Sequence, residues 1–499
     1  MVVLNQLLLV LLATTASLPI SVADTQFQSR PDLAPPRLNI TVKAPDANGT
    51  EYVFITPFQP SLERPGAYIY RKDGDLVWAG TGYYTATVGN FQPTEYHGKP
   101  VLQAFQGAMN TVPGTGYGQH VLLDQSYEHI VTAIPGNHRI ACLHEFNVID
   151  GQTALVEIFQ PTPANLTPYG GNSSRLWIGD GIVQDFDIET GDVIFEWSAL
   201  DYIDPADSLV TLESSGPSAG LAPATSWDYV HLNSVDKDAD GNYLVSGHHT
   251  STIYKINGTD GSIIWRLGGN NSTFNQVGNW TFGFQHDARW LPHGGNAIER
   301  FSFFDNSAGG AVHYNKISSA VIVQLDHTNN TATIQRKAQA PYGLSVGSAG
   351  NTQLLPNDHL FVGWGSEGAY TEFGPANEVL YHAFIQNGVS YRAFASSWTG
   401  TPREDPAIVA VKSAKSVTLY VSWNGDTRTS RWKFYRVSGG NKAEIGEVDR
   451  RSFESSLVWQ TPEPTNSSFQ FFAEAFDKNG KSLARTGEVE AVPPLRGVH

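Results

Sequence analysis

The sequence contains a single cysteine, Cys142, among its 499 residues. An intrachain disulfide cannot form, so packing and hydrogen bonds must hold the fold together. Cys142 lies in the apolar run Ile140 to Leu143, which favours a buried structural thiol over a nucleophile. One cysteine cannot build a cysteine-based zinc site, and the sequence motifs predict no metal ligands and no cofactor.

Basic residues are also scarce, since 32 Lys and Arg are outnumbered by 48 Asp and Glu and the formal net charge is −16. An acidic surface repels nucleic acid and anionic lipid, which excludes both as main partners. Beyond the N-terminus no stretch is apolar enough to span a bilayer, and no lipid-anchor signal ends the chain. The tripeptide Gly480-Lys481-Ser482 lacks the first glycine of a phosphate-binding loop, which excludes a nucleotide-dependent transferase.

The N-terminus predicts export. Residues 1–23 read as a signal peptide, with the apolar run Leu7 to Leu12 and the small-x-small ending Ser21 to Ala23, and residues 24–59 form an extension. Ten N-x-S/T sequons are expected to carry glycans: Asn39, Asn48, Asn165, Asn172, Asn257, Asn270, Asn271, Asn279, Asn329 and Asn466. We therefore expect a secreted glycoprotein without a membrane anchor.

One hairpin pattern recurs along the chain. A strand leads into a glycine turn and then into a second strand, which in the three best copies contains a tryptophan. Glycine supplies the positive φ of the turn, and the tryptophan can pack between neighbouring sheets. The copies occupy residues 67–78, 183–197 and 251–269, with a weaker one at 321–335.

A second hairpin type precedes some of these, at residues 234–246 and 353–363. Together the two hairpins give a unit of four short strands, which is typical of a propeller blade. Residues 60–400 have room for about six such blades of roughly 40–60 residues. The long loop at 201–225 is expected either to cover the central channel as a lid or to be a tolerated insertion.

The pattern changes after residues 396–406, which favour a linker. Residues 401–499 then contain alternating apolar strands separated by turns such as Asn424-Gly425. About 90 residues of this kind are typical of a fibronectin/Ig-like β-sandwich. The predicted fold is therefore all-β, a six-bladed β-propeller followed by a C-terminal β-sandwich.

Polar side chains gather in three segments of the predicted propeller, at residues 227–235, 284–289 and 303–306. Each segment lies where the first strand of a blade would begin. Because first strands line the central channel, histidine and asparagine from different blades would converge there. Alone, each segment is more typical of a turn or a satisfied core residue.

Two further motifs are rejected or kept as minor alternatives. The run Asp236-x-Asp238-x-Asp240-Gly241 copies the first half of a calcium loop, but Gly247 stands where the bidentate glutamate is required. Residues 187–197 resemble the repeat of quinone-cofactor propeller dehydrogenases, which leaves a quinone-dependent dehydrogenase as an alternative.

The polar segments resemble the arylsulfotransferase (aryl sulfate sulfotransferase) family, especially its fungal secreted branch. The match is best over residues 231–269, from His-Leu-Asn-Ser-Val-Asp to Ile-Ile-Trp-Arg-Leu-Gly-Gly, and over 285–306, which contain Gln-His-Asp-Ala-Arg and Phe-Asp-Asn. This resemblance implies a six-bladed propeller with its site in the central channel. It also implies transfer of a sulfuryl group from an aryl sulfate to a phenol without a nucleotide, so the expected partner is a phenolic or aromatic small molecule.

The resemblance also implies residue roles. Histidine can serve as nucleophile or proton carrier near neutral pH, and cationic groups must neutralise the sulfonate oxygens. The implied catalytic residues are His231, His286, Asn233 and Arg289, the last pairing with the sulfonate. The implied substrate-binding residues are Trp227, Asp305, Asn306, His248 and His249.

Three departures from the family pattern keep other functions open. His248 replaces a frequent arginine, residues 307–310 directly after Asp305-Asn306 contain no arginine, and no histidine lies between residues 328 and 358. One alternative is acid–base cyclisation or rearrangement of a phenolic secondary metabolite. Another is a non-catalytic extracellular binding propeller.

Overall fold

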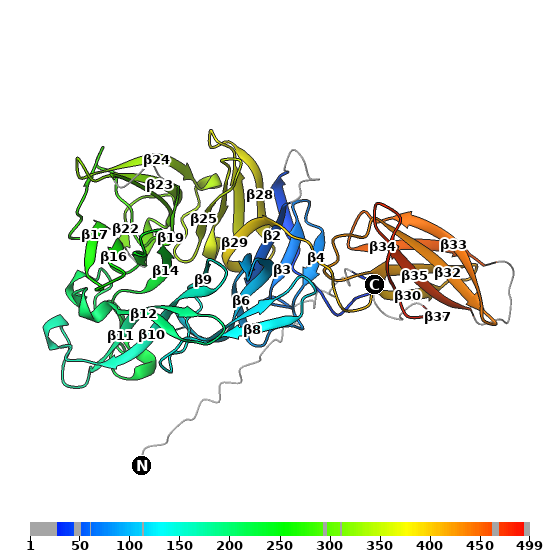
Figure 1. Ribbon diagram of the computed structural model, residues 1–499, viewed down its shortest axis with the longest axis horizontal. Coiled ribbons are helices and arrows are strands. Elements are labelled where there is room, and N and C mark those ends of the chain that lie inside the picture. Colours follow the sequence, from blue (N-terminus) through cyan, green and yellow to red (C-terminus); the bar gives the residue numbers. More distant parts are fainter. Residues whose placement is uncertain are drawn as a thin grey trace, which may run out of the picture.

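The computed structural model describes residues 27–43, 51–59, 61–111, 114–292, 297–309, 312–461 and 469–493 (Figure 1). The predicted signal peptide and the sequons at Asn48 and Asn466 lie outside these residues. Seven of the other eight sequon asparagines are exposed, and Asn257 is half-buried. Among the described residues, helices long and apolar enough to cross a membrane are absent.

Six antiparallel sheets of four main strands form the propeller. The first comprises β29 (Val389–Ser397), β2 (Glu51–Phe58), β3 (Tyr68–Arg71) and β4 (Leu76–Ala79). The second comprises β5 (Thr87–Tyr96), β6 (Lys99–Asn110), β7 (Thr115–Leu123) and β8 (His129–Ala133). The third comprises β9 (Phe146–Ile149), β10 (Thr153–Pro163), β11 (Trp177–Asp187) and β12 (Val193–Ser198), with β13 (Trp227–Asp228) added beside β11.

The remaining three sheets continue in chain order. The fourth comprises β14 (Leu232–Lys237), β15 (Tyr243–Gly247), β16 (Thr252–Ile256) and β17 (Ile263–Gly268). The fifth comprises β19 (His286–Trp290), β20 (Ile298–Asp305), β23 (Ser319–Asp326) and β24 (Thr331–Gln339), with β18 (Asn275–Gln276) at its edge. The sixth comprises β25 (Asn351–Leu354), β26 (Leu360–Gly363), β27 (Ala369–Phe373) and β28 (Val379–Ile385), with β1 (Leu38–Val42) at its edge. A small hairpin, β21 (Ala308–Gly309) and β22 (Val312–His313), lies outside the six sheets.

The ring closes through a late strand. β29 pairs with β2, so the first sheet joins the two ends of the propeller and leaves no open edge between them. Each sheet contacts the next, and β26 and β25 of the sixth sheet contact β29 of the first. The expected six blades are therefore present. The propeller begins earlier than residue 60, because β1 and β2 belong to its sheets.

Glycine turns and packed tryptophans shape the blades as the repeat predicts. Gly191 and Gly261 have φ angles of 76° and 75°, which a side chain with Cβ rarely adopts. Trp197 is buried between the third and fourth sheets, and its Nε1 donates a hydrogen bond to the Gly261 carbonyl at 3.0 Å. The apolar core thus consists of layers between successive blades.

The loop at 201–225 packs against this core, and its role as a lid stays a prediction. It contains three short 3₁₀ turns, η2 (Ala199–Asp201), η3 (Pro205–Asp207) and η4 (Pro223–Thr225). Ile203 and Leu212 are buried between the third and fourth sheets. The other 3₁₀ turns are η1 (Thr167–Tyr169), η5 (Pro341–Gly343) and η6 (Gly365–Glu367).

The C-terminal strands form a separate lobe beside the first sheet (Figure 1). They are β30 (Ala407–Lys412), β31 (Ser416–Ser422), β32 (Arg431–Ser438), β33 (Asn441–Asp449), β34 (Glu454–Gln460), β35 (Gln470–Phe476), β36 (Ser482–Arg485) and β37 (Val489–Val492). Because β37 pairs with both β30 and β35, they make one continuous, barrel-like eight-stranded sheet around an apolar core. The fibronectin/Ig-like topology stays a prediction. The Asn424 amide exchanges two hydrogen bonds with the Ala79 backbone and ties the lobe to the propeller.

Candidate active site

A cavity of about 350 Å³ lies where the inner strands of several blades begin. Its wall carries five histidines: His144, His231, His248, His249 and His286. The rest of the wall is apolar or weakly polar: Phe58, Thr87, Val88, Gly89, Met109, Gly114, Leu143, Ser348, Ala349 and Tyr391. Among the described residues, neither Lys nor Arg lines it.

Equivalent positions in three blades bring the histidines together. His144 lies two residues before β9, His231 directly before β14, and His286 is the first residue of β19. His248 and His249 follow β15 in the same blade as His231. Ring centroids of successive histidines lie 4.7 to 5.2 Å apart along this cluster. His231 and His286 therefore face one shared cavity, as the blade positions predict.

His231 is held by Asp228. One carboxylate oxygen accepts the His231 backbone N–H at 3.0 Å, and the other lies 2.5 Å from ring Nδ1. Burial raises the pKa of Asp228, but the positive charge and hydrogen bonds of His231 outweigh it, and the pKa falls below its ordinary value. An ionised Asp228 accepts the Nδ1 proton, so in the neutral form of His231 the lone pair is on Nε2. The φ of 47° at His231 is a strained backbone of the kind found at functional sites.

His286 is held by Asn306. The Asn306 amide nitrogen donates to the Val346 and Ala349 carbonyls, both at 3.0 Å, which fixes its side-chain oxygen toward His286 Nδ1 at 2.8 Å. The Ala349 N–H donates to Nε2 at 3.3 Å. Burial lowers the pKa of His286 to about 3, so the ring is neutral with its proton on Nδ1.

His248 and His249 are also neutral rings of the cavity wall. Both ring nitrogens of His248 are buried and make no hydrogen bond, and burial lowers its pKa well below the ordinary value. His249 Nδ1 donates to the Asp228 carbonyl at 2.6 Å, and burial, reinforced by His231, lowers its pKa to about 4. The unpaired nitrogens of His248 are available to a bound molecule.

Arg289 occupies a different place from the one expected. Its guanidinium bonds Glu145 at 2.7 Å, Asp287 at 2.9 Å and the Val235 carbonyl at 3.0 Å, and it is not part of the cavity wall. Two carboxylates therefore neutralise the charge that was expected to meet a sulfonate. We correct its assignment from a catalytic residue to a member of a buried charge network.

The other predicted residues support the site from behind. Asn233 Nδ2 donates to the Gln285 carbonyl at 2.7 Å. Trp227 is buried between blades, and its Nε1 donates to the Val210 carbonyl. Asp305 accepts bonds from the Gly283 N–H and the Ser307 hydroxyl, and burial raises its pKa to about 6. None of Asn233, Trp227 and Asp305 lines the cavity.

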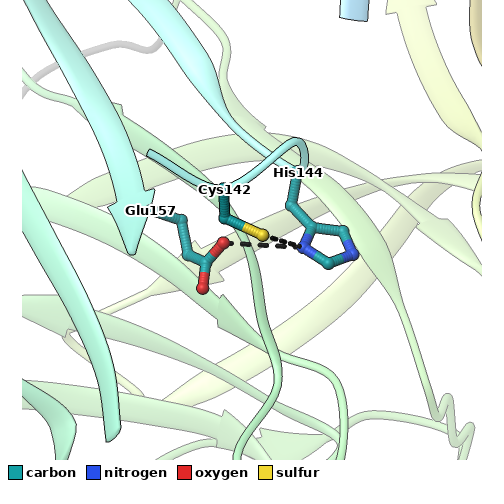
Figure 2. Close-up of side chains that lie close together, drawn as sticks. All are labelled: Cys142, His144 and Glu157. Carbon is teal, nitrogen blue, oxygen red and sulfur yellow. Dashed lines mark hydrogen bonds and ion pairs between the residues drawn. The ribbon is translucent and has the colours of Figure 1, made fainter. Parts of the chain in front are cut away.

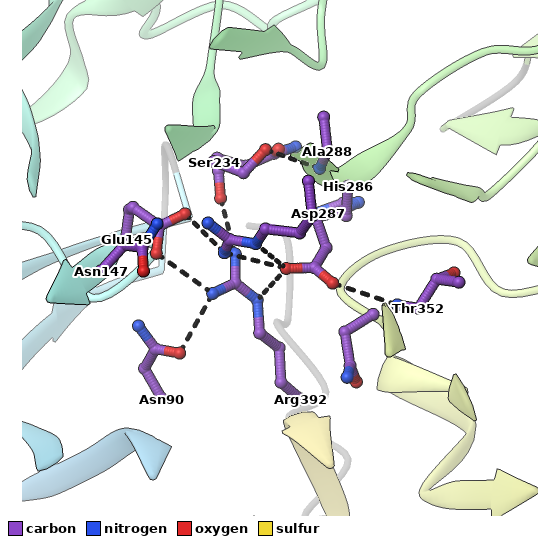
Figure 3. A network of polar contacts seen from close by, with 12 residues as sticks. Asn90, Glu145, Asn147, Ser234, His286, Asp287, Ala288, Thr352 and Arg392 are labelled. Carbon is purple, nitrogen blue, oxygen red and sulfur yellow. Dashed lines mark hydrogen bonds and ion pairs between the residues drawn. The ribbon is translucent and has the colours of Figure 1, made fainter. Parts of the chain in front are cut away.

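Tyr391 lines the cavity, and the residue after it belongs to the charge network. Figure 3 shows Arg392 of this network beside Asn90, Glu145 and Asp287. Arg392 is fully buried and bonds Asn90 at 3.0 Å, Glu145 at 3.4 Å and the Asn233 carbonyl at 2.9 Å. The Arg392 and Arg289 charges face those of Glu145 and Asp287. This network fixes the inner strands behind the histidines.

Of the five cavity histidines, only His144 was not predicted from the sequence. It lies two residues before the inner strand β9, close to the blade position that singled out His231 and His286. The signal was present but lay beside Cys142, whose apolar run suggested only core packing. Figure 2 shows His144 turned toward Cys142 and Glu157.

Comparisons with known proteins give one family. The family model described as Arylsulfotransferase (ASST) matches residues 92–388, which hold all five cavity histidines. No curated protein matches this chain. A Bacteroides caccae protein of unknown function is 11% identical, with a TM-score of 0.38 over 71% of this chain and 99% of that one. The GH43 protein BlXynB from Bacillus licheniformis is 9% identical, with a TM-score of 0.31 over 81% and 90%. Such low scores carry no functional argument.

Proposed function

The chain belongs to the arylsulfotransferase (ASST) family, and from this premise we propose that it is an enzyme acting on a phenolic or other aromatic small molecule in the histidine-lined cavity. The observation that carries the proposal is the pair formed by Asp228 and His231. The ring of His231, which carries the Nε2 lone pair, is part of the wall of an otherwise largely apolar cavity. An apolar cavity with a few placed polar groups suits an aromatic ligand.

Sulfuryl transfer would use His231 as nucleophile. Nε2 attacks the sulfur of an aryl sulfate, a sulfur–nitrogen bond forms, and the bond from sulfur to the aryl oxygen breaks to release a phenolate. The acceptor phenol then gives its proton to a neighbouring imidazole, attacks sulfur and regenerates His231. Asp228 stabilises the cationic ring of the intermediate. The ring centroids of His144, His249 and His248 lie 4.7, 4.8 and 5.2 Å from that of His231, so these neutral rings can move the protons. His286 adjoins His248 at 4.8 Å.

A second candidate function is proton transfer alone, such as cyclisation or rearrangement of a phenolic compound. The absence of Lys and Arg from the described cavity wall favours it. A sulfonate carries negative charge that cationic donors would have to balance. Proton transfer from a phenol needs a base and an acid only, and neutral imidazoles supply both.

The test supplies an aryl sulfate whose phenol is coloured, together with a phenol acceptor. Release of coloured phenol that depends on the acceptor and is lost in His231→Ala supports sulfuryl transfer. His359→Ala is the matched control, because His359 pairs with Glu372 away from the cavity. A panel of phenolic compounds without donor, followed by mass and NMR analysis, tests proton transfer. If neither assay gives a reaction sensitive to His231, the chain is a binding propeller.

We also propose that the protein enters the secretory pathway and carries glycans. The exposure of seven sequon asparagines supports this. Digestion with an N-glycan-specific amidase should lower the apparent mass of the protein from a eukaryotic host. N-terminal sequencing should begin near Asp24. An unprocessed N-terminus with no mass shift would contradict both parts.

A further inference from the structure

Three potential metal ligands meet beside the cavity: Cys142, His144 and Glu157 (Figure 2). Cys142 Sγ lies 3.1 Å from His144 Nδ1, and Glu157 Oε2 lies 3.5 Å from the same nitrogen. Cys142 and His144 come from the segment before β9, and Glu157 from β10 of the same blade. All three are buried, and each exposes at most 3% of its surface.

Core packing alone does not account for the polar contacts of this cluster. The Gly116 N–H donates to Cys142 Sγ at 3.3 Å, a contact that suits a thiolate. Glu157 Oε2 is buried and makes no hydrogen bond. A buried carboxylate oxygen without a donor costs free energy unless a cation or proton satisfies it. Neither Lys nor Arg forms an ion pair with Glu157 in the described part of the chain.

We infer that Cys142, His144 and Glu157 bind one divalent transition-metal ion, with Zn²⁺ the best match to the ligand set. Metal–ligand bonds of about 2.0–2.3 Å at tetrahedral angles place ligand atoms roughly 3.3–3.6 Å apart, close to the separations observed. A thiolate and a carboxylate balance the two charges of the ion, and binding releases the protons that these acids carry. Thiolate and imidazole ligands exclude Ca²⁺ and Mg²⁺.

The ion would change what His144 offers the cavity. Coordination through Nδ1 leaves the remaining ring proton on Nε2, so His144 becomes a fixed hydrogen-bond donor. Since His144 forms part of the cavity wall, this donor would act on a bound molecule. The inference goes beyond the proposed function and does not depend on which reaction occurs.

The test uses the full-length protein after chelator treatment and buffer exchange. Titration with Co²⁺ should give one equivalent of binding with a sulfur-to-cobalt charge-transfer band, and Zn²⁺ should displace it. Cys142→Ser should abolish the band. Glu157→Gln keeps the side-chain shape but removes the charge of the ligand. It should weaken the affinity for Co²⁺ by at least about 10–100-fold, which is the loss typical of an outer-shell partner.

Asp228→Asn is the matched control, because Asp228, His231 and His249 form a second cluster of potential ligands facing the same cavity. It should leave the charge-transfer band intact, with folding of every variant checked by circular dichroism. Absence of Co²⁺ binding by the folded protein overturns the inference. The inference is also overturned if Co²⁺ binds without the charge-transfer band, still binds to Cys142→Ser and no longer binds to Asp228→Asn. The ion would then occupy the second cluster.

Discussion

Asn306 accepts the Nδ1 proton of His286 at 2.8 Å, and this bond fixes which nitrogen of the ring keeps a lone pair. Asn306→Asp keeps an acceptor but adds a negative charge that stabilises the protonated ring. The pKa of His286, lowered by burial to about 3, should therefore rise. If His286 carries protons during turnover, the acidic limb of the kcat/KM profile should move to higher pH. Asn387→Asp, at an exposed turn, should leave the profile unchanged; equal profiles in all three proteins would contradict a positioning role.

Acid should destabilise the protein through its buried neutral histidines. Burial holds the folded-state pKa of His286 near 3 and that of His249 near 4, below the ordinary 6.5. Between these values the unfolded chain binds more protons, so their contribution to stability is complete above pH 6.5 and lost as pH falls. The loss is up to about 1.4 kcal/mol per pH unit for each ring.

Urea unfolding from pH 7 to pH 4.5 measures this effect. His286→Gln should show a shallower loss of unfolding free energy than the parent protein. The comparison is needed because burial raises the pKa of Asp305 to about 6, and such a carboxyl works in the opposite direction. Parallel curves for parent and variant would contradict the neutral state of His286.

Asp228→Asn should disable His231 while keeping the fold. The amide oxygen would stay with the His231 N–H, which leaves the amide NH₂ facing ring Nδ1. The ring must then carry its proton on Nε2, where the lone pair is needed. We expect kcat/KM to fall by about 10²–10⁴-fold. A variant that retains activity with an unchanged circular dichroism spectrum would mean that His231 neither attacks nor accepts a proton.

The blades were predictable because their signals are local. A glycine turn between two apolar strands is written within about 15 residues, as at Gly191 and Gly261, and the repeat of such units indicates closure. The same locality explains why the propeller start predicted at residue 60 differs from the observed one. β2 carries no hairpin signal of its own, and one of its two partner strands, β29, lies more than 300 residues away in the sequence.

Side-chain partners were less predictable because they depend on contacts distant in sequence. Arg289 lies close to His286 in the sequence, yet its charge is paired with that of Glu145 from another blade. His144 was overlooked because its polar partner Glu157 lies across a turn on β10. Positions at the start of inner strands predicted that His231 and His286 share the cavity, whereas the ion pairs had to come from the structure.

Gly89 offers a test of where the substrate lies. It lines the cavity, and a Cβ added there would meet only Leu143 Cδ1, at 3.9 Å. Gly89→Ala should therefore fold and act normally. Gly89→Leu would place a branched chain in the cavity and should raise KM by about tenfold or more with little change in thermal stability. An unchanged KM would place the substrate elsewhere.

Arg392 should be the most costly single charge to remove from the propeller. Its side chain is fully buried and faces both Glu145 and Asp287, so Arg392→Met leaves buried carboxylates short of a counter-charge. We expect the free energy of unfolding in urea to fall by about 3–5 kcal/mol. Arg403→Met is the matched control, because its side chain is 75% exposed and its pair with Glu128 should contribute less than about 1 kcal/mol.

The double variant Arg392→Met with Glu145→Gln separates charge from packing. Removing one carboxylate together with the arginine reduces the unbalanced charge, so part of the lost stability should return. If the two substitutions are simply additive, the cost of Arg392→Met comes from lost packing and from its bonds to Asn90 and the Asn233 carbonyl. The network would then hold the inner strands by side-chain packing. In that case the cavity histidines would keep their positions in the double variant only if no void opens behind Tyr391.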